Sequence, residues 1–306
     1  MTFPLPELRE IFGQSLQESV RLANYTTSHT GGPVLAFIPV NTLEELRFAA
    51  KKLWELEVEY RVLGGGSNIL VSDKGYIGAV ILNRCHNLRI NSQLENPTVN
   101  AESGVNLSVM SRQVALRGLA GLEWTGSIPG TVGGAVYGNA GAFCSDVASV
   151  LKSAKILTPE GERDFDIQAM GYEYRSSTFK RAHVPAVILE ASFNVQSSTR
   201  EATMQRLKEL TEKRKVSQPQ GPSFGSTFRN PRGDSAGRLI EAAGLKGYSL
   251  EHAGFSPIHA NFIVNDGQAS AQEYYHLIRL AQERVKTQFG IDLELEIELL
   301  GEFDEN

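Results

Sequence analysis

The order of apolar and polar positions divides the chain into three regions, and the first has the pattern of a small α/β unit. Apolar runs bounded by turn residues predict four strands, at 34–40, 59–63, 69–71 and 78–82. Helical spacing over 5–20 predicts a first helix, and a second helix should run from Thr42 to about Leu56. Glu45 follows Thr42 by three residues, which is the spacing of a capping box.

The second region, from about 85 to 195, changes to short strands separated by turn-rich segments. Strands are predicted at 97–102, 151–157, 163–166 and 187–196. One helix, at about 106–118, interrupts them. We expect an α+β domain with mostly antiparallel strands here.

The third region follows a charged helix at 199–215 and a break at Gln218–Pro222, which is the strongest linker candidate in the sequence. The elements predicted in this region are helices at 235–243 and 270–288 and strands near 247–255, 260–264 and 291–299. Domain boundaries are therefore expected near 84/85 and 198/199.

Composition narrows the class of protein. A chain of 306 residues with 41% hydrophobic content can form two or three domains, and its formal net charge of −5 argues against general nucleic-acid binding. No run approaches the roughly 20 apolar residues of a membrane span, and residues 1–22 do not resemble a signal peptide, so we expect a cytoplasmic protein. Two cysteines, Cys85 and Cys144, form neither a disulfide framework nor a zinc set, and no metal site is predicted.

Two glycine clusters suggest a ligand. Gly64, Gly65 and Gly66 follow a predicted strand and precede Ser67 and Asn68. Glycines there let successive N–H groups aim at one anion such as a pyrophosphate, although a plain structural turn is the alternative. The cluster matches neither the dinucleotide-binding nor the P-loop motif.

The second cluster runs from 121 to 141 and consists mostly of small residues. Its candidate ligand contacts are Ser127, Ile128, Pro129, Gly130, Gly133, Gly134, Asn139 and Ala140. Two such clusters on two predicted domains favour a large cofactor held between the domains.

Further motifs follow in order: Tyr172-x-Tyr174-Arg175-x-Ser177, Gly225-Ser226-Thr227-Phe228-Arg229-Asn230-Pro231, Ser235-Ala236-Gly237-Arg238-Leu239-Ile240-Glu241, Gly244-Leu245-Lys246-Gly247, His259-Ala260-Asn261-Phe262 and Leu293-Glu294-Leu295-Glu296-Ile297. Together they resemble the UDP-N-acetylenolpyruvoylglucosamine reductase family, in its shorter class without an inserted substrate loop. The glycine clusters resemble the FAD-binding domain of vanillyl-alcohol-oxidase-type flavoproteins. Departures from the family pattern occur at His29, Gly138, Arg229 and Leu295, and none removes a proposed catalytic side chain.

This resemblance implies an α+β flavoprotein of three domains. Residues 1–84 would form the first FAD-binding subdomain, to which the terminal strand at 291–301 could return, and 85–198 would form the second. Residues 199–306 would form a C-terminal α/β substrate-binding domain. The implied enzyme is an oxidoreductase of peptidoglycan precursor synthesis. NADPH reduces non-covalently bound FAD, which then reduces the enolpyruvyl ether of a UDP-sugar; no nucleic acid, membrane or obligate protein partner is implied.

The same resemblance selects the catalytic residues. Arg175 would stabilise the developing enolate, since a guanidinium can hold a carboxylate with two hydrogen bonds. Ser226 would deliver a proton to the substrate carbon, and Glu296 would orient the site or stabilise the intermediate. Strand alternation by itself places Glu294, Glu296 and Glu298 on one face and does not choose among them.

Weaker candidates for substrate contacts are Tyr137, Tyr174, Arg214, Asn230 and His259. The basic run 213–215 could meet a diphosphate or could be a solvated helix C-terminus. Two other functions are kept as alternatives. A flavin oxidase on the same fold would react rapidly with oxygen and need no UDP-sugar, and a non-catalytic binding protein would consume no NADPH.

Overall fold

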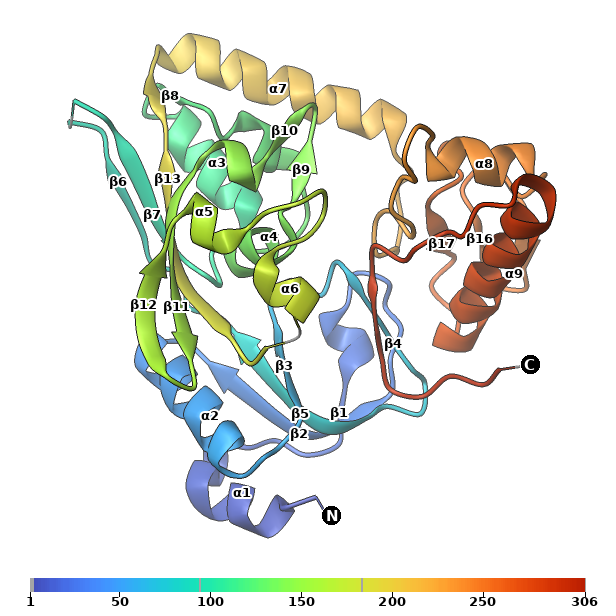
Figure 1. The fold of residues 1–306 in the computed structure, drawn as a ribbon, viewed down its shortest axis with the longest axis horizontal. Helices are drawn as coiled ribbons and strands as arrows, with labels where there is room; N and C mark the ends of the chain where they lie inside the picture. Colours follow the sequence, from blue (N-terminus) through green and yellow to red (C-terminus); the bar gives the residue numbers. More distant parts are fainter. Residues whose placement is uncertain (1–2, 94, 183, 306) are drawn as a thin grey trace.

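The computed structural model describes residues 3–93, 95–182 and 184–305. Two of its domains pack side by side, and the C-terminal domain lies at one end of them (Figure 1). No helix in these ranges combines the length and apolar composition that a membrane span needs.

The first domain is built on a four-stranded sheet in the order β1-β2-β5-β3. Its strands are β1 (Val20–Arg21), β2 (Pro33–Val40), β3 (Tyr60–Leu63) and β5 (Tyr76–Asn83). β5 lies parallel to both β2 and β3, and β1 is antiparallel to β2. Helix α2 (Leu43–Glu55) makes the crossover from β2 to β3 and begins with the predicted capping box at Thr42. The predicted helix over 5–20 is wrong in length, because α1 (Leu5–Phe12) ends where Gly13 adopts a φ of 51°.

The second domain contains a five-stranded sheet in the order β12-β11-β13-β7-β6, antiparallel throughout. Its strands are β6 (Leu88–Asn91), β7 (Thr98–Glu102), β11 (Leu151–Thr158), β12 (Gly161–Phe165) and β13 (Val187–Asn194). Alternate residues of these strands form a large core with α3 (Leu107–Ala115) and α4 (Val132–Gly138). β6 was not predicted, because its short polar sequence carries little apolar signal.

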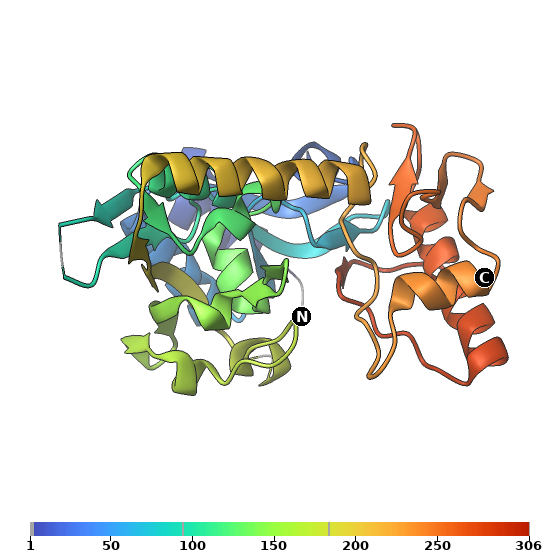
Figure 2. The ribbon, with the colours of Figure 1, turned by 90° about the horizontal axis from the view of Figure 1, so that it is seen from above.

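Helix α7 (Arg200–Ser217) connects the second domain to the third. In Figure 2 it crosses the second domain and ends where the C-terminal domain begins. Its buried Thr203 and Leu210 attach it to the second domain, and most of its charged residues face solvent, with the half-buried Arg214 as an exception.

The third domain packs α8 (Ala236–Ala242) and α9 (Ala271–Phe289) with a small sheet. That sheet, β15 (Ser249–Leu250), β16 (Ala253–Phe255) and β17 (Ile263–Asn265), is antiparallel, so the α/β arrangement expected for this domain is corrected to α+β. The remaining short elements are β8 (Leu119–Ala120), β9 (Gly141–Ala142), β10 (Ser145–Asp146), β14 (Gln196–Ser197), α5 (Ile167–Met170) and α6 (Thr178–Ala182).

The end of the chain returns to the first domain. β18 (Glu298–Leu300) pairs in parallel with β4 (Ile69–Val71), directly after the first glycine cluster (Figure 1). The strand predicted at 291–299 is therefore wrong in extent, since a regular strand forms only at Glu298–Leu300 and the segment before it contributes a single bridge, between Leu295 and Phe228. Asp73 reinforces the junction, because its carboxylate accepts hydrogen bonds of 3.0 Å from the Ala271 and Gln272 N–H groups at the start of α9.

Candidate active site

The two glycine clusters come from different domains and lie against each other. Ser67 Oγ donates a 3.0 Å hydrogen bond to the Pro129 carbonyl oxygen. A Cβ atom added to Gly65 would lie 3.1 Å from the Gly130 Cα atom. Larger residues would separate the two loops, so the glycines are required for this contact.

The first cluster keeps backbone donors available. Within the described chain, the N–H groups of Gly65, Gly66 and Ser67 donate to no acceptor. Successive unpaired N–H groups form a concave anion site. In the facing loop, Ser127 Oγ is buried and has no partner among the described residues. These donors suit the pyrophosphate and polar groups of a dinucleotide such as FAD.

Other predicted cofactor contacts are used inside the protein. The Ile128 and Gly133 N–H groups donate to the Thr125 and Ser103 carbonyls at 3.1 and 2.7 Å. The Asn139 amide donates to the Glu173 carbonyl and accepts from the Ala148 N–H, both at 3.0 Å. Gly64 lies in the first loop and Pro129 in the facing loop, whereas Gly134 lies within α4 and Ala140 follows that helix.

Arg175 occupies a strained turn that the Asn139 amide holds in place. The turn is closed by pairing between Glu173 and Ser176, and Arg175 has a φ of 56°, in the left-handed region. Such a backbone costs a residue with a side chain about 1–3 kcal/mol, which the surrounding contacts must offset. The result directs the guanidinium toward Glu296, whose Oε1 lies 2.8 Å from Arg175 Nε.

Glu296 is held by the first and third domains. Its N–H donates to the Thr227 carbonyl at 2.9 Å, and its carbonyl accepts from Asn68 Nδ2 at 3.1 Å. Ser226 directly precedes Thr227 and follows Gly225, whose φ is 81°. The segments that carry Arg175, Ser226 and Glu296 therefore converge beside the glycine clusters.

The electrostatics of the site centre on the Glu296 carboxyl. Burial raises its pKa, and Arg175, Lys180 and Arg229 oppose that rise. Burial, with a contribution from Arg175, lowers the pKa of Arg214 to about 10. Cations thus outnumber anions around a largely buried carboxyl.

The predicted placement of Glu294, Glu296 and Glu298 on one face of a strand is wrong. Side-chain exposure is 77% at Glu294 and 16% at Glu296. The segment before β18 is not a regular strand, so alternation does not apply to it. Burial and the contact with Arg175 distinguish Glu296 from its neighbours.

A pocket of about 280 Å³ adjoins this centre. It is lined by Tyr174, Arg229, Asn230, Pro231, Arg232, Asp292 and Glu294. Two predicted substrate contacts, Tyr174 and Asn230, therefore come together, although Asn230 Oδ1 already accepts from the Ala236 N–H at 3.0 Å. The Arg175 guanidinium lies 5.5 Å from the Tyr174 ring centroid.

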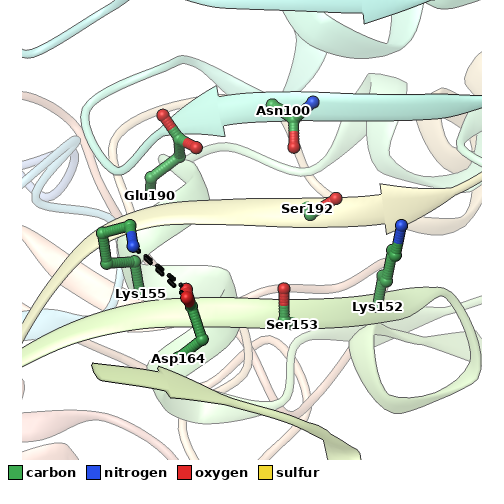
Figure 3. A pocket seen from close by; sticks show the side chains of 7 residues that line it. All are labelled: Asn100, Lys152, Ser153, Lys155, Asp164, Glu190 and Ser192. Atoms are coloured by element: carbon green, nitrogen blue, oxygen red, sulfur yellow. Dashed lines mark hydrogen bonds and ion pairs between the residues drawn. The ribbon is translucent and has the colours of Figure 1, made fainter.

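The other predicted substrate residues lie outside this pocket lining. Burial raises the pKa of Tyr137 to about 12, and its carbonyl accepts from Ser177 Oγ at 2.7 Å. His259 packs on Phe262, with ring centroids 5.0 Å apart, and its Nδ1 accepts from the Asn261 N–H at 3.2 Å. A second hollow of about 300 Å³ lies on the outer face of the five-stranded sheet and contains no predicted site residue (Figure 3).

Buried polar atoms without hydrogen-bond partners gather at the site. The described chain has seven, of which five are Ser127 Oγ, Arg175 Nε, Ser176 Oγ, Thr227 Oγ1 and Arg229 Nε. Arg175 Nε is the exception among these five, because it lies 2.8 Å from Glu296 Oε1 and forms an ion pair with that carboxylate. Because buried polar groups in folded proteins are nearly always paired, this concentration indicates a polar ligand.

Sequence reasoning missed Lys180 and did not count Arg229 among the site residues. Both contribute to the field at Glu296. Arg229 stood in a recognised motif, whereas Lys180 is a single lysine five residues after Arg175 with no pattern to separate it from surface lysines. No three His, Cys, Asp or Glu side chains of the described ranges lie together as a metal site would require.

Family comparisons agree with this geometry. Residues 217–300 match the C-terminal domain of UDP-N-acetylenolpyruvoylglucosamine reductase, and residues 34–163 match an FAD binding domain. The reductase of Chlamydia pneumoniae is 38% identical, over 98% of this chain and 94% of its own length. That of Chloroflexus aggregans is 37% identical, over 96% of this chain and 100% of its own. The chain belongs to the UDP-N-acetylenolpyruvoylglucosamine reductase family.

A solved structure of the family extends the agreement to the fold. The UDP-N-acetylenolpyruvylglucosamine reductase of Thermus caldophilus is 34% identical and superimposes with a TM-score of 0.79, covering 94% of this chain and 100% of its own. The expected family, the α+β flavoprotein fold and the reductase assignment are confirmed. The individual site residues and domain boundaries stay predictions.

Proposed function

We propose that this chain is an FAD-dependent oxidoreductase that uses NADPH to reduce UDP-N-acetylglucosamine enolpyruvate to UDP-N-acetylmuramate. Membership of the reductase family supports the reaction. The observation that carries the proposal to this site is the presence of four buried polar atoms without partners, Ser127 Oγ, Ser176 Oγ, Thr227 Oγ1 and Arg229 Nε. A polar ligand there would satisfy them.

FAD would be held between the two glycine clusters by Gly64–Asn68 and by the segment from Ser127 to Gly134, which includes the first turn of α4. The free N–H groups of Gly65, Gly66 and Ser67 would receive phosphate oxygens, and Ser127 Oγ is available for a further hydrogen bond. When bound, FAD supplies the hydride carrier between NADPH and the substrate. Since no covalent attachment is proposed, acid precipitation should release the flavin into the supernatant.

Arg175 would hold the substrate carboxylate and stabilise the negative charge that spreads onto it during reduction. A fixed cation in a largely buried site is effective because it needs no rearrangement as the charge develops. Glu296 would orient the guanidinium through their 2.8 Å contact. Ser226 would protonate the substrate carbon, directly or through a water molecule.

The pocket beside Tyr174, Arg229 and Asn230 would take a polar part of the UDP-sugar, with Tyr137, Arg214 and His259 as outer contacts. Its mixed cationic and amide lining suits a phosphate-bearing ligand. We also propose the domain division at 84/85 and 198/199, in which α7 belongs to the third domain but packs on the second, and a cytoplasmic location. The partners would be small molecules, with no nucleic acid, membrane or obligate protein partner.

The test is anaerobic stopped-flow absorbance in the band of oxidised flavin. NADPH should bleach the band, and UDP-N-acetylglucosamine enolpyruvate should restore it. Bleaching without recovery would reject this substrate and keep the flavoprotein. Recovery with oxygen alone at a comparable rate would favour an oxidase, and a protein that binds FAD but never bleaches would be a non-catalytic binder.

A further inference from the structure

Lys180 lies on the short helix α6, which follows the turn that carries Arg175. Two contacts fix this helix. Phe179 is buried and meets the Phe165 ring edge-on, with ring centroids 5.0 Å apart. The Lys180 N–H donates to Ser177 Oγ at 3.3 Å, and that hydroxyl donates to the Tyr137 carbonyl. The base of the Lys180 side chain is therefore attached to the same scaffold as Arg175.

The Lys180 ammonium is nearly enclosed, although its side chain is long enough to reach water elsewhere. Its side chain is 12% exposed, and Nζ lies 3.9 Å from Glu298 Oε1. That distance is too long for a hydrogen bond, so the ion pair compensates only part of the desolvation. Burial lowers the pKa of Lys180, which Glu298 and Glu296 oppose. An enclosed lysine with so little direct pairing needs another reason for its position.

The charges around Glu296 supply that reason. Arg175 Nε lies 2.8 Å from Glu296 Oε1, and Lys180 Nζ of α6 lies 3.9 Å from Oε1 of Glu298, two residues further along the same segment. Together with Arg229 from the segment after Ser226, these cations lower the pKa of the Glu296 carboxyl against the effect of burial. Glu298 of β18 is the acid next to Lys180, and it also acts on Tyr137 of α4. Arg214 of α7 acts on Arg175. Because burial favours the neutral form of the Glu296 carboxyl, each cation removed makes ionisation harder.

We propose that Lys180 is a positioning residue whose ammonium, paired with Glu298, keeps the Glu296 carboxyl ionised and thereby keeps the Arg175 guanidinium oriented. A protonated Glu296 would lose its ion pair with Arg175 and release the guanidinium from its fixed direction. Lys180 thus acts through Glu296 on the substrate-reducing half-reaction. This inference rests on the proposed function.

The test compares Lys180→Met and Lys180→Arg in the two half-reactions across pH. NADPH should bleach the flavin of both variants as in the wild type. The rate of flavin reoxidation by substrate should fall as the pH is lowered and Glu296 becomes protonated. In Lys180→Met this fall should occur at a pH about one unit higher than in the wild type, because a nearby cation typically lowers the pKa of an acid by about one unit. Lys180→Arg, which keeps the charge, should retain the wild-type pH profile.

Lys155→Met is the matched control, since Lys155 forms a similar ion pair, 3.3 Å from Asp164, on the outer face of the second-domain sheet (Figure 3). Its profile should equal that of the wild type. Superimposable profiles for Lys180→Met and wild type, or an equal shift in Lys180→Arg, would overturn the inference. If Lys180→Met fails to bind FAD, Lys180→Gln replaces it as the uncharged variant, and its pH profile of flavin reoxidation is compared with those of Lys180→Arg and the wild type. Failure of the wild type itself to reoxidise with substrate would reject the proposed function instead.

Discussion

Arg175 shows how a single residue is held against its local preference. Its left-handed backbone would be easier for glycine, yet the proposed reaction uses its guanidinium, and Asn139 and the paired turn hold the conformation. Ser226 has the opposite solution, because the glycine before it takes the left-handed conformation and leaves the serine unstrained. The left-handed conformation therefore falls on Arg175 itself in one segment and on the neighbouring Gly225 in the other.

The role of Ser226 can be separated by half-reaction. Ser226→Ala should leave bleaching by NADPH nearly unchanged and slow reoxidation by substrate about 100-fold or more, the usual scale of general-acid catalysis. Ser249→Ala, an exposed serine of β15, should change neither rate. Both rates should be measured by anaerobic stopped-flow. Equal loss in the two half-reactions would show that Ser226 is structural.

At neutral pH, the ionised Glu296 carboxylate should lower the free energy of unfolding, because burial favours its protonated form. Its folded-state pKa lies above 4.5, so the stability that it contributes is complete below pH 4.5 and is lost as pH rises through the raised value. Glu296→Gln, which resembles the protonated acid, should match the wild type in acid and unfold at higher denaturant concentration at neutral pH. Urea unfolding of the FAD-bound proteins at both pH values measures this. A less stable variant at neutral pH would mean that its ion pair with Arg175 outweighs burial.

At the scale of elements, the site depends on two loops that can approach only through glycine. Gly66 has a φ of 59°, and a Cβ atom there would collide with the Tyr25 carbonyl oxygen. β3 and β4 lie on either side of this loop. A displacement of the loop would therefore move Asn68, whose side-chain amide donates to the Glu296 carbonyl oxygen, together with the free N–H groups.

Gly66→Ala should therefore destabilise the protein by about 1–3 kcal/mol, the usual range for overpacking a site that cannot adjust, and should weaken FAD binding. Gly138→Ala is the matched control, because an added Cβ meets nothing within 4 Å and its φ is not left-handed. It should bind FAD like the wild type. Flavin fluorescence titration and thermal unfolding report the two quantities. Wild-type affinity in Gly66→Ala would show that the loop can adjust.

At the scale of the whole molecule, the segment that follows the third domain returns to the first domain. β18 pairs with β4, and Asp73 of the first domain caps α9 of the third. These contacts hold the Glu296 segment between the glycine loop and the Ser226 segment. The placement of three domains is thus a condition of the site.

Asp73→Ala should lower the free energy of unfolding by about 1 kcal/mol, the usual value of a helix cap. It should also loosen the third domain, so reoxidation by substrate should slow more than bleaching by NADPH. Glu55→Ala, which removes only an exposed ion pair with Lys52 on α2, should change stability by a few tenths of a kcal/mol and leave both half-reactions unchanged. Denaturant unfolding and the two half-reactions measure these effects. Unchanged stability in Asp73→Ala would mean that the cap contributes nothing to domain docking.

The sequence by itself determined the local elements and the family of this protein. Capping boxes, apolar periods and glycines at strand ends act over a few residues, so they are readable in order along the chain; the box at Thr42 and the helices at 200–217 and 271–289 are examples. Ordered motifs likewise identified the reductase family before any contact was known. Glu296 was chosen over its two neighbours by motif alone, because alternation made them equivalent.

Only the tertiary structure decided which residues share one environment. Burial separates Glu296 from Glu294, and the packing of α6 brings Lys180 into the same electrostatic field. The amides of Asn68 and Asn139 are committed to backbone carbonyls, a use that their residue type does not reveal. The Asn139 contact joins residues 34 apart, and the Asn68 contact joins residues 228 apart. Neither separation can be read from local sequence patterns, because the geometry depends on how the segments and domains pack.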